Sequence, residues 1–330
     1  MAVVSSAGLE MREISLPREI IVKAPATTAN LGPGFDVFGI ALEYPSDKVT
    51  IVPTSRDIRI EVSGLGADII PTNPEKNTAG VVAKEILEEF SLRIGLTIKL
   101  EKGILPSVGL GSSAASAAAV AFGLDRLFDL KLDKEQLVRL AAKGEIASAG
   151  FEHADNVSAA IYGGFTIVSS YSPLEIVYLE SPQNLDVCIA IPEGPILSGK
   201  TEKARSVLPK AVSMEKLVHN VGHAAAIAAG FATGDVDLIG RSMSDAVVEP
   251  ARAFLIPGYQ KVKESALKSG ACGVAISGAG PAMLAIVDRN KADVSDVAEA
   301  MREGFKSVKV GAETFCTKPG KGVSLLEVKQ

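Results

Sequence analysis

The sequence predicts a chain of two α/β domains. Its 330 residues exceed what a single hydrophobic core usually organises. Strand-like and helical patterns follow one another along the chain, and the pattern starts again near Ser181–Pro182. We therefore place an N-terminal domain at 1–181, of which 1–18 form a loosely tied extension, and a C-terminal domain at 182–330.

The N-terminal domain is expected to combine strands rich in β-branched residues with amphipathic helices. Val81, Val82, Ile86 and Leu87 form the apolar stripe of one helix, and Asp133 is placed to cap another. Strands are expected at 19–25, 47–52, 57–62, 94–100, 164–170 and 174–179, and helices at 78–90, 112–128 and 133–149.

The C-terminal domain shows a different order of elements. Strands are expected at 185–191, 272–277, 282–287 and 308–315, a helical block at 200–243, and helices at 259–268 and 294–305. The order strand, helices, strand, strand, helix, strand is that of a ferredoxin-like split β-α-β fold with additional helices.

Composition and charge exclude several classes of function. The chain is 47% apolar and 22% charged, which is ordinary for a soluble globular protein. A net charge of −5 argues against a general polyanion binder, and the absence of Trp with 5% aromatics argues against a stacking platform for single-stranded nucleic acid. We expect no nucleic-acid partner.

The cysteines and the apolar stretches indicate a cytoplasmic protein. Cys188, Cys272 and Cys316 are far apart within apolar runs, so we expect reduced, buried thiols. The uncharged stretch 103–124 is interrupted by Gly and Pro, and its Ala-rich remainder is too short to cross a bilayer. The first residues lack the basic cluster of a signal peptide, so we expect no membrane association.

The most informative segment is PSVGLGSSAAS at 106–116, which precedes the Ala-rich helix. A glycine turn that leads into a helix presents backbone N–H groups to an anion. Ser112 and Ser113 add hydroxyls for phosphate oxygens or Mg²⁺. A Walker A loop is excluded because its lysine is missing, and a dinucleotide fingerprint because the β-α-β context is missing. The alternative is a simple glycine turn with a serine cap.

Two further glycine-rich segments carry polar side chains or close backbone contacts. APATTANLGPGFDVFGI at 24–40 places Asn30 and Asp36 on a tight loop, where they bind a small polar molecule or only form an Asx-type turn. ISGAGPAML at 276–284 reads as a strand, turn and strand whose glycines let another backbone approach, or as a plain hairpin loop.

In this order and at these separations, the three segments resemble the motifs of the GHMP small-molecule kinase superfamily, and in detail its homoserine kinase branch. FEHADNVSAAIYGGF and EPARAFLIPGY add to this resemblance, which spans about residues 20 to 325. It implies an N-terminal half like the second domain of ribosomal protein S5, a ferredoxin-like C-terminal half, and an active site in the cleft between them.

The resemblance also implies an ATP site with Mg²⁺. Asn77 matches the position that contacts adenine, although it also suits a helix N-cap. Ser113 and Glu145 match the Mg²⁺ ligands. Glu145 also continues the core-facing stripe of its helix, where a carboxylate needs a partner. The alternative is an acid at the helix rim that reaches water. The phosphate-binding residues are Pro106, Ser107, Val108, Gly109, Leu110, Gly111, Ser112, Ser113, Ala114, Ala115 and Ser116.

The substrate residues implied by the resemblance match the groups of homoserine. Arg205 and Arg252 would bind the carboxylate, since a guanidinium fork can hold both oxygens. Asp36 would pair with the ammonium group, and Asn30 and His153 would complete the lining. Asn156 would position the reacting hydroxyl, and Asp155 is the alternative candidate for a general base.

The implied activity is therefore ATP-dependent phosphorylation of L-homoserine to O-phospho-L-homoserine in threonine biosynthesis. The alternatives are another kinase of the superfamily, acting on shikimate or mevalonate, and a non-catalytic ligand sensor on the same fold. A sensor would be expected to lose the phosphate serines or the Mg²⁺ acid, which this sequence keeps. The resemblance also suggests a homodimer.

Overall fold

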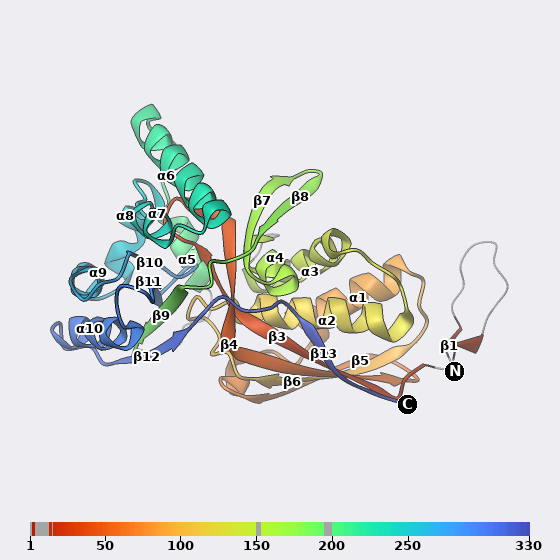
Figure 1. Cartoon of the computed structure of the whole chain (residues 1–330). Coiled ribbons are helices and arrows are strands. Elements are labelled where there is room, and N and C mark those ends of the chain that lie inside the picture. Colours follow the sequence, from red (N-terminus) through yellow and green to blue (C-terminus); the bar gives the residue numbers. More distant parts are fainter. Residues whose placement is uncertain (1, 4–12, 15, 150–152, 195–199) are drawn as a thin grey trace.

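The computed structural model describes residues 2–3, 13–14, 16–149, 153–194 and 200–330. Its elements form two α/β halves that lie side by side (Figure 1). In the described part of the chain, every helix is too short or too polar to span a bilayer.

The first half is a seven-stranded sheet with helices on one face. Its strands are ordered β13-β3-β4-β6-β5, with β7 pairing β4 and β8 pairing β7. The strands are β3 (Glu19–Asn30), β4 (Gly34–Thr54), β5 (Ile58–Gly64), β6 (Gly95–Lys102), β7 (Phe165–Tyr171), β8 (Leu174–Leu179) and β13 (Ser324–Lys329). The helices are α1 (Thr78–Glu89), α2 (Ser112–Phe128), α3 (Lys134–Ala149) and α4 (Asp155–Tyr162), with short 3-10 turns η1 (Ala67–Ile69) and η2 (Pro74–Lys76).

The second half is a four-stranded antiparallel sheet of order β10-β11-β9-β12. Its strands are β9 (Leu185–Pro192), β10 (Gly273–Ile276), β11 (Met283–Asp288) and β12 (Ala312–Thr317), and its helices are α5 (Lys200–Ser206), α6 (Met214–Thr233), α7 (Val236–Arg241), α8 (Val248–Arg252), α9 (Tyr259–Lys268) and α10 (Val294–Lys306), with a 3-10 turn η3 (Ala253–Leu255). This is the strand order of the ferredoxin-like fold, so the predicted topology is confirmed.

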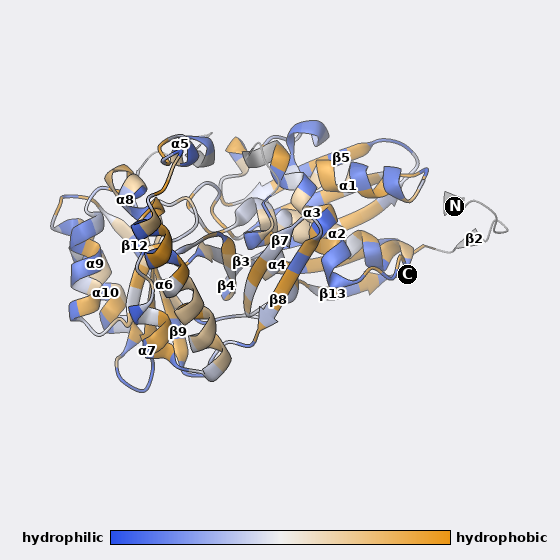
Figure 2. Cartoon of the chain, turned by 90° about the horizontal axis from the view of Figure 1, so that it is seen from above, coloured by the Kyte–Doolittle hydropathy of each residue, from blue (hydrophilic) through white to orange (hydrophobic). Residues whose placement is uncertain are grey.

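Hydropathy shows how the helices of the second half pack. Hydrophobic and hydrophilic stretches alternate along α9 and α10 (Figure 2). The buried residues of α10 are Val297, Ala298, Met301, Gly304 and Phe305, which recur at the three- and four-residue spacing of one helix face. That face covers β9 and β12, whereas the charged residues of α10 remain in water.

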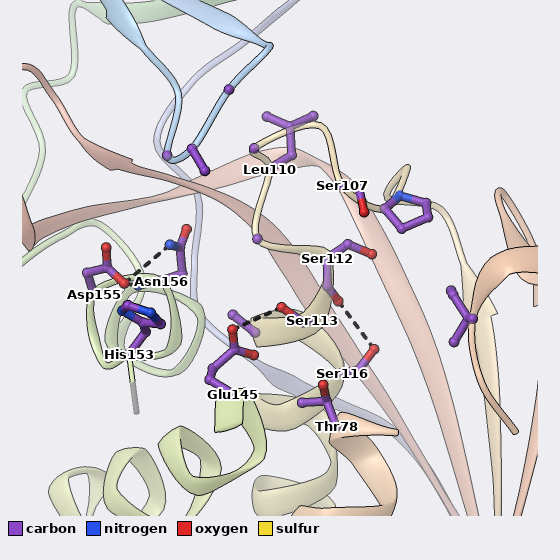
Figure 3. A pocket seen from close by; sticks show the side chains of 18 of the residues that line it. Thr78, Ser107, Leu110, Ser112, Ser113, Ser116, Glu145, His153, Asp155 and Asn156 are labelled. Atoms are coloured by element: carbon purple, nitrogen blue, oxygen red, sulfur yellow. Dashed lines mark hydrogen bonds between the residues drawn. The ribbon is translucent and has the colours of Figure 1, made fainter. Parts of the chain in front are cut away.

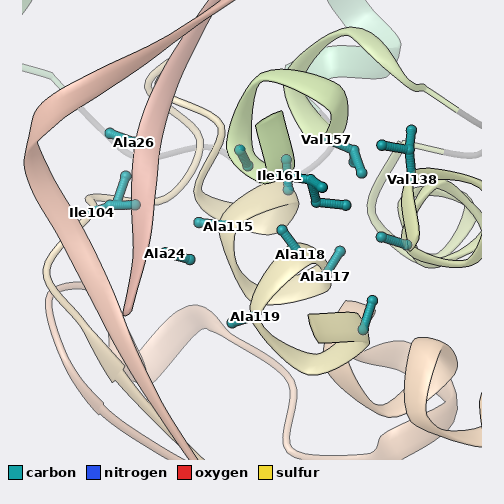
Figure 4. Close-up of a cluster of buried hydrophobic side chains, with 14 of the residues drawn as sticks. Ala24, Ala26, Ile104, Ala115, Ala117, Ala118, Ala119, Val138, Val157 and Ile161 are labelled. Atoms are coloured by element: carbon teal, nitrogen blue, oxygen red, sulfur yellow. The ribbon is translucent and has the colours of Figure 1, made fainter. Parts of the chain in front are cut away.

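Helix α2 is the centre of the first half, and its alanines explain why. It packs against β3 and β4 on one side and against α1, α3 and α4 on the others. Figure 4 shows Ala115, Ala118 and Ala119 between Ala24 of β3 and Ile161 of α4. All of these side chains are buried. Only small side chains let a helix approach neighbours on all sides, and this packing fixes the N-terminus of α2.

The structure corrects several predicted elements. The segment 24–40 continues β3 to Asn30 and starts β4 at Gly34, so the predicted loop is only a short turn. Strand β12 starts four residues later than predicted, and α4, α8 and β13 were not predicted.

The last strand also modifies the predicted domain organisation. The sequence assigned everything from 182 onward to the C-terminal domain. Strand β13 instead pairs with β3 of the first sheet, and Pro319 and Lys321 bridge to Leu42 and Gly163. The chain therefore returns to its first half at the end, while the boundary near 181 stays a prediction. Short strands β1 (Ala2–Val3) and β2 (Glu13–Ile14) pair with each other within the predicted extension, most of which lies outside the described residues.

Candidate active site

The site is a pocket of about 690 Å³ to which both halves contribute. This volume lies in the range of pockets that bind small molecules. Its walls come from the start of α2, the region before α1, the end of β3, and the segments around Arg205, Arg252 and Gly278. Of the residues predicted from the sequence, the pocket is lined by Asn30, Asp36, Asn77, Pro106, Ser107, Gly109, Leu110, Gly111, Ser112, Ser113, Ala114, Ser116, Glu145, His153, Asp155, Asn156, Arg205 and Arg252.

Two predicted phosphate-loop residues do not line it. The side chains of Val108 and Ala115 are buried in the hydrophobic core. The backbone of Val108 accepts a hydrogen bond from Ala282 N–H at 3.0 Å, so the residue joins the loop to β11 rather than facing the pocket.

The N-terminus of α2 is open toward the pocket. Its N-cap is Gly111 with φ +63°, and within the described residues no side chain caps the first turn. The first backbone N–H groups of a helix have no intrahelical partner and, with the positive end of the helix dipole, favour an anion. Figure 3 shows Ser112, Ser113 and Ser116 grouped at this end. An uncapped helix terminus beside three hydroxyls suits an anion, and phosphate binding here stays a prediction.

Gly111 has no room for a side chain. A Cβ at this position would lie 1.9 Å from Thr27 Oγ1 and 3.1 Å from Asn156 Oδ1. Thr27 Oγ1 itself donates to Asn156 Oδ1 at 2.8 Å. The missing side chain therefore leaves room for the contact that fixes Asn156.

Ser113 and Glu145 face each other next to the helix terminus (Figure 3). Ser113 Oγ donates to Glu145 Oε2 at 3.0 Å, and Glu145 is 7% exposed. The alternative of a helix-rim acid that reaches water is therefore wrong. Three His, Cys, Asp or Glu side chains do not gather at any point of the described ranges. One carboxylate and one hydroxyl are nevertheless hard oxygen donors, and Mg²⁺ commonly takes few protein ligands beside phosphates and water.

Asn77 caps α1, as the alternative reading of this residue predicted. Its Oδ1 accepts from Ala79 N–H at 2.9 Å and its Nδ2 donates to the carbonyl of Pro71 at 2.6 Å. The side chain is buried, and Ile69, Ile70 and Pro71 lie with it along the same wall of the pocket. This wall is the apolar part of the site, beside the phosphate loop.

At the opposite end of the pocket, Asp36, His153 and Arg205 come together. Arg205 Nη2 donates to Asp36 Oδ2 at 2.6 Å, and His153 Nδ1 lies 3.8 Å from Asp36 Oδ1. Burial lowers the pKa of His153, against the opposing effect of the Asp36 charge. Asn30 Oδ1 accepts from the backbone N–H of Asp36 at 3.1 Å and so holds the aspartate in place.

Arg252 lies at the same end of the pocket and is almost completely buried. Its Nε donates to the carbonyl of Ala204 at 2.9 Å and its Nη1 to the carbonyl of Gly278 at 3.1 Å. The guanidinium carbons of Arg205 and Arg252 lie 5.2 and 5.1 Å from the ring centroid of Phe35. Both cations therefore contact the same ring, although they come from separate segments.

Asp155 and Asn156 begin α4 between the two ends of the pocket. Asp155 Oδ1 accepts from the backbone N–H and the Nδ2 of Asn156 at 2.7 and 3.3 Å. Burial, reinforced by the charge of Asp36, raises the pKa of Asp155 to about 7. Asp155 is therefore partly protonated near neutral pH.

Comparison with known proteins agrees with this geometry. The chain matches GHMP kinases N terminal domain over residues 77–164 and GHMP kinases C terminal over residues 226–307. A homoserine kinase of Methanococcus vannielii is 46% identical over 314 residues, which cover 94% of this chain and 100% of that protein. The chain belongs to the homoserine kinases of the GHMP kinase family. The family resemblance seen in the sequence is thus confirmed.

Solved structures separate this family from its wider fold. A homoserine kinase from Cytophaga hutchinsonii has a TM-score of 0.87 and 36% identity, and the match covers 96% of this chain and 100% of that one. An L. major mevalonate kinase in complex with R-mevalonate has a TM-score of 0.63 at 15% identity, over 94% of this chain and 98% of that one. The second likeness shows the fold alone. The predicted fold class, two α/β halves of a GHMP kinase, is confirmed.

A buried ion pair packs against the start of α2 and was not predicted from the sequence. Lys102 Nζ contacts Asp47 Oδ2 and donates to the carbonyl of Ser112 and to Ser116 Oγ, both at 2.9 Å. Asp47 Oδ1 accepts from the N–H groups of Gly103 and Ile104 at 2.9 and 3.0 Å. Burial lowers the pKa of Lys102 and raises that of Asp47.

A signal for Lys102 was present in the alternation of its strand. Leu96, Ile98 and Leu100 occupy the inward positions of β6, and Lys102 is the next inward residue. A lysine on the core face of a strand needs a buried partner. The sequence does not reveal that this partner is Asp47, 55 residues earlier.

The raised pKa of Asp155 predicts a pH-dependent stability. Between its ordinary pKa of 3.8 and its folded pKa of about 7, the unfolded chain binds fewer protons than the folded chain. This group therefore lowers the stability of the fold as pH rises through that window. Asp155→Asn keeps an acceptor without the charge, so its melting temperature relative to the unmodified protein should rise from pH 5 to 7 and level off above pH 8.

The measurement is thermal unfolding of both proteins across this pH range. Asp129→Asn, at an exposed position at the end of α2, is the matched control and should differ from the unmodified protein by a constant amount. A constant difference for Asp155→Asn would show that this carboxyl group does not titrate near neutrality.

Proposed function

We propose that this protein transfers the terminal phosphoryl group of ATP to the side-chain hydroxyl of L-homoserine, giving O-phospho-L-homoserine for threonine biosynthesis. One observation carries the proposal: a single pocket is lined both by the uncapped N-terminus of α2 and by the Asp36–Arg205 ion pair. The homoserine kinases that the chain resembles over almost its whole length support the same activity.

The nucleotide is proposed to lie along the wall between η1 and α2. The N–H groups at the start of α2 bind the phosphates, and Ser112, Ser113 and Ser116 surround them. The base lies toward Ile69, Ile70 and Asn77, where the pocket is apolar. Because the Nδ2 and Oδ1 of Asn77 already make intramolecular hydrogen bonds, its contact with adenine is expected to be by packing or through remaining lone pairs.

Mg²⁺ is proposed as the metal cofactor, held by Ser113 and Glu145. The hydrogen bond between these two side chains places two oxygen donors at the phosphate-binding end of the pocket, which fits a hard cation. When bound, Mg²⁺ neutralises charge on the transferring phosphoryl group. The acid of this pair lies in a buried position, where its charge acts strongly on neighbouring groups.

Homoserine is proposed to bind at the opposite end. Its carboxylate takes the guanidinium groups of Arg205 and Arg252, and its ammonium group takes Asp36, with Asn30 and His153 beside them. The side chain then extends toward the phosphate loop, past Asn156. This order puts the reacting hydroxyl between the two ends of the pocket.

Phosphoryl transfer depends mainly on positioning and on charge stabilisation. Thr27 donates to Asn156 Oδ1, and Asn156 Nδ2 donates to Asp155 Oδ1, so both ends of the amide are held. The second N–H of Nδ2 is proposed to donate to the substrate hydroxyl. The hydroxyl proton is proposed to leave through the phosphate environment rather than to a dedicated side-chain base. Asp155 is the alternative acceptor, since its pKa of about 7 suits a general base.

The homodimer, the absence of a nucleic-acid partner and the cytoplasmic location stay predictions. A non-catalytic sensor on this fold is disfavoured because Ser112, Ser113 and Glu145 come together at the helix terminus. A shikimate or mevalonate substrate would leave Asp36 without the ammonium group that it is proposed to bind.

Substrate identity is tested by ADP release with homoserine, threonine, shikimate and mevalonate. Homoserine should be the preferred acceptor, and Arg205→Ala should lower its kcat/KM about 30-fold or more while the KM for ATP stays nearly unchanged. The reason is that removing one partner of a desolvated charge pair costs about 2 kcal/mol or more, at about 1.4 kcal/mol per factor of ten.

A homoserine analogue with an amidated carboxylate distinguishes this contact from a packing role. The analogue should react poorly with the unmodified protein and lose little more in Arg205→Ala, because the same interaction cannot be lost twice. Arg302→Ala, at an exposed position on α10, is the control with normal kinetics. If the two losses multiply, Arg205 does not bind the carboxylate, and a preferred acceptor other than homoserine would overturn the proposed function.

The metal role of Glu145 predicts a loss in the chemical step. Glu145→Gln should lower kcat about 100-fold or more, with partial recovery at high Mg²⁺, because several kcal/mol of charge stabilisation depend on the metal. Glu135→Gln, on the exposed side of the same helix, should keep normal activity. Steady-state kinetics over a Mg²⁺ series measures this effect. An unchanged kcat in a stably folded Glu145→Gln protein would contradict the assignment.

A further inference from the structure

Two cysteines outside the pocket face each other across neighbouring strands. Cys188 of β9 and Cys316 of β12 are direct partners in the antiparallel register, although 128 residues separate them in the chain. Direct partners in an antiparallel pair have side chains on the same face and Cα atoms about 4.5 to 5.5 Å apart. Disulfides form over Cα separations of about 4.4 to 6.8 Å. The register therefore permits a disulfide without movement of the backbone.

The surroundings of Cys316 make it the more reactive thiol. Its side chain is exposed, contrary to the buried thiol predicted from the sequence. Its Sγ lies 3.6 Å from the carbonyl of Val294, the first residue of α10, so it packs against the first turn of that helix. A hydrogen bond from the Cys188 S–H, with a smaller contribution from the Ser295 hydroxyl, lowers the pKa of Cys316 to about 7.

Cys188 has the opposite character. It lies fully buried in the apolar cluster between the second sheet and α9 and α10. The hydrogen bond to Cys316 and burial both raise its pKa, so it remains a protonated thiol that donates to its neighbour. One exposed thiolate and one buried thiol in contact form the usual arrangement of an attacking and a resolving cysteine.

We propose that Cys316 and Cys188 form a peroxide-reactive thiol pair that closes to a cross-strand disulfide. The Cys316 thiolate attacks one oxygen of hydrogen peroxide, the O–O bond breaks, and hydroxide leaves as Cys316 becomes a sulfenic acid. Cys188 sulfur then attacks Cys316 sulfur, the S–S bond forms and the S–O bond breaks. The leaving hydroxide takes the Cys188 proton. In total, two thiols are oxidised, and one peroxide is reduced to two molecules of water.

Cys272 provides an internal comparison. Burial raises its pKa to about 11, and its Sγ lies 3.4 Å from Asp237 Oδ1. It is therefore expected to react slowly with peroxide at neutral pH. The three cysteines of the chain thus divide into one reactive pair and one inert thiol.

The test treats the reduced full-length protein with hydrogen peroxide, alkylates it under denaturing conditions with N-ethylmaleimide, and measures the intact mass. The expected product carries one alkyl group, on Cys272, and has lost two hydrogen atoms. In Cys188→Ser, whose hydroxyl keeps a donor to Cys316 but cannot form a disulfide, Cys316 should instead accumulate a sulfenic acid that dimedone traps. Cys316→Ser should give neither product, whereas Cys272→Ser should still form the disulfide. The rate of Cys316 alkylation by iodoacetamide should reach half its maximum near pH 7.

Four outcomes would overturn the proposal. They are three alkylated thiols in the treated protein, a disulfide that includes Cys272, a disulfide between two chains on a non-reducing gel, and the absence of a dimedone adduct in Cys188→Ser. A circular dichroism spectrum like that of the unmodified protein shows that Cys188→Ser is folded. If that variant does not fold, the proposal is tested by the alkylation rate of Cys316 in the unmodified protein. A rate that rises only above pH 8 contradicts the proposal.

Discussion

The arrangement of the site depends on one residue, Gly278, in the turn between β10 and β11. Its carbonyl oxygen and its N–H group both make contacts with the site. This oxygen accepts from Asn30 Nδ2 at 2.8 Å and from Arg252 Nη1 at 3.1 Å. The N–H of the same residue donates to the carbonyl of Ala29 at 3.2 Å. Gly278 has φ +55°, a conformation that glycine adopts without strain. One turn of the second half therefore fixes both the end of β3, which carries Asn30, and a buried guanidinium of the pocket.

The same turn holds the phosphate loop, which is fixed from two sides. Ser277 Oγ donates to the carbonyl of Gly109 at 2.6 Å, and a Cβ on Gly109 would lie 2.2 Å from the carbonyl of Ser277. The predicted close approach of another backbone to the 276–284 segment is thus confirmed. On its other side, the loop is held by Lys102, whose Nζ donates to the carbonyl of Ser112. The N–H groups at the start of α2 are oriented before any anion arrives, so little reorganisation is needed on binding.

Sequence reasoning predicted the elements with strong local patterns, and it failed where tertiary contacts decide. Both ends of helix α2 were predicted correctly, because its Ala-rich sequence starts directly after Gly111 and the helical pattern continues without interruption to Phe128. Strand β13 was missed because all six of its residues are exposed and show no alternation; it is a strand only because β3 offers an edge. The site residues of each motif could be identified singly, but the pairing of Arg205 with Asp36, 169 residues apart, follows only from the fold.

That pairing also explains how the site can distinguish an amino acid from a simple carboxylic acid. Arg205 and Asp36 neutralise each other at positions about 30% and 27% exposed. A ligand with only a carboxylate would draw Arg205 away and leave Asp36 without its cation in a largely enclosed pocket, which is costly. A ligand with both a carboxylate and an ammonium group replaces the Asp36–Arg205 ion pair by two ion pairs, one between its carboxylate and Arg205 and one between its ammonium group and Asp36. No charge is then left unpaired. In the proposed mode of binding, Asp36 is therefore the element that disfavours mevalonate-like acids, because a ligand without an ammonium group would leave its charge unpaired.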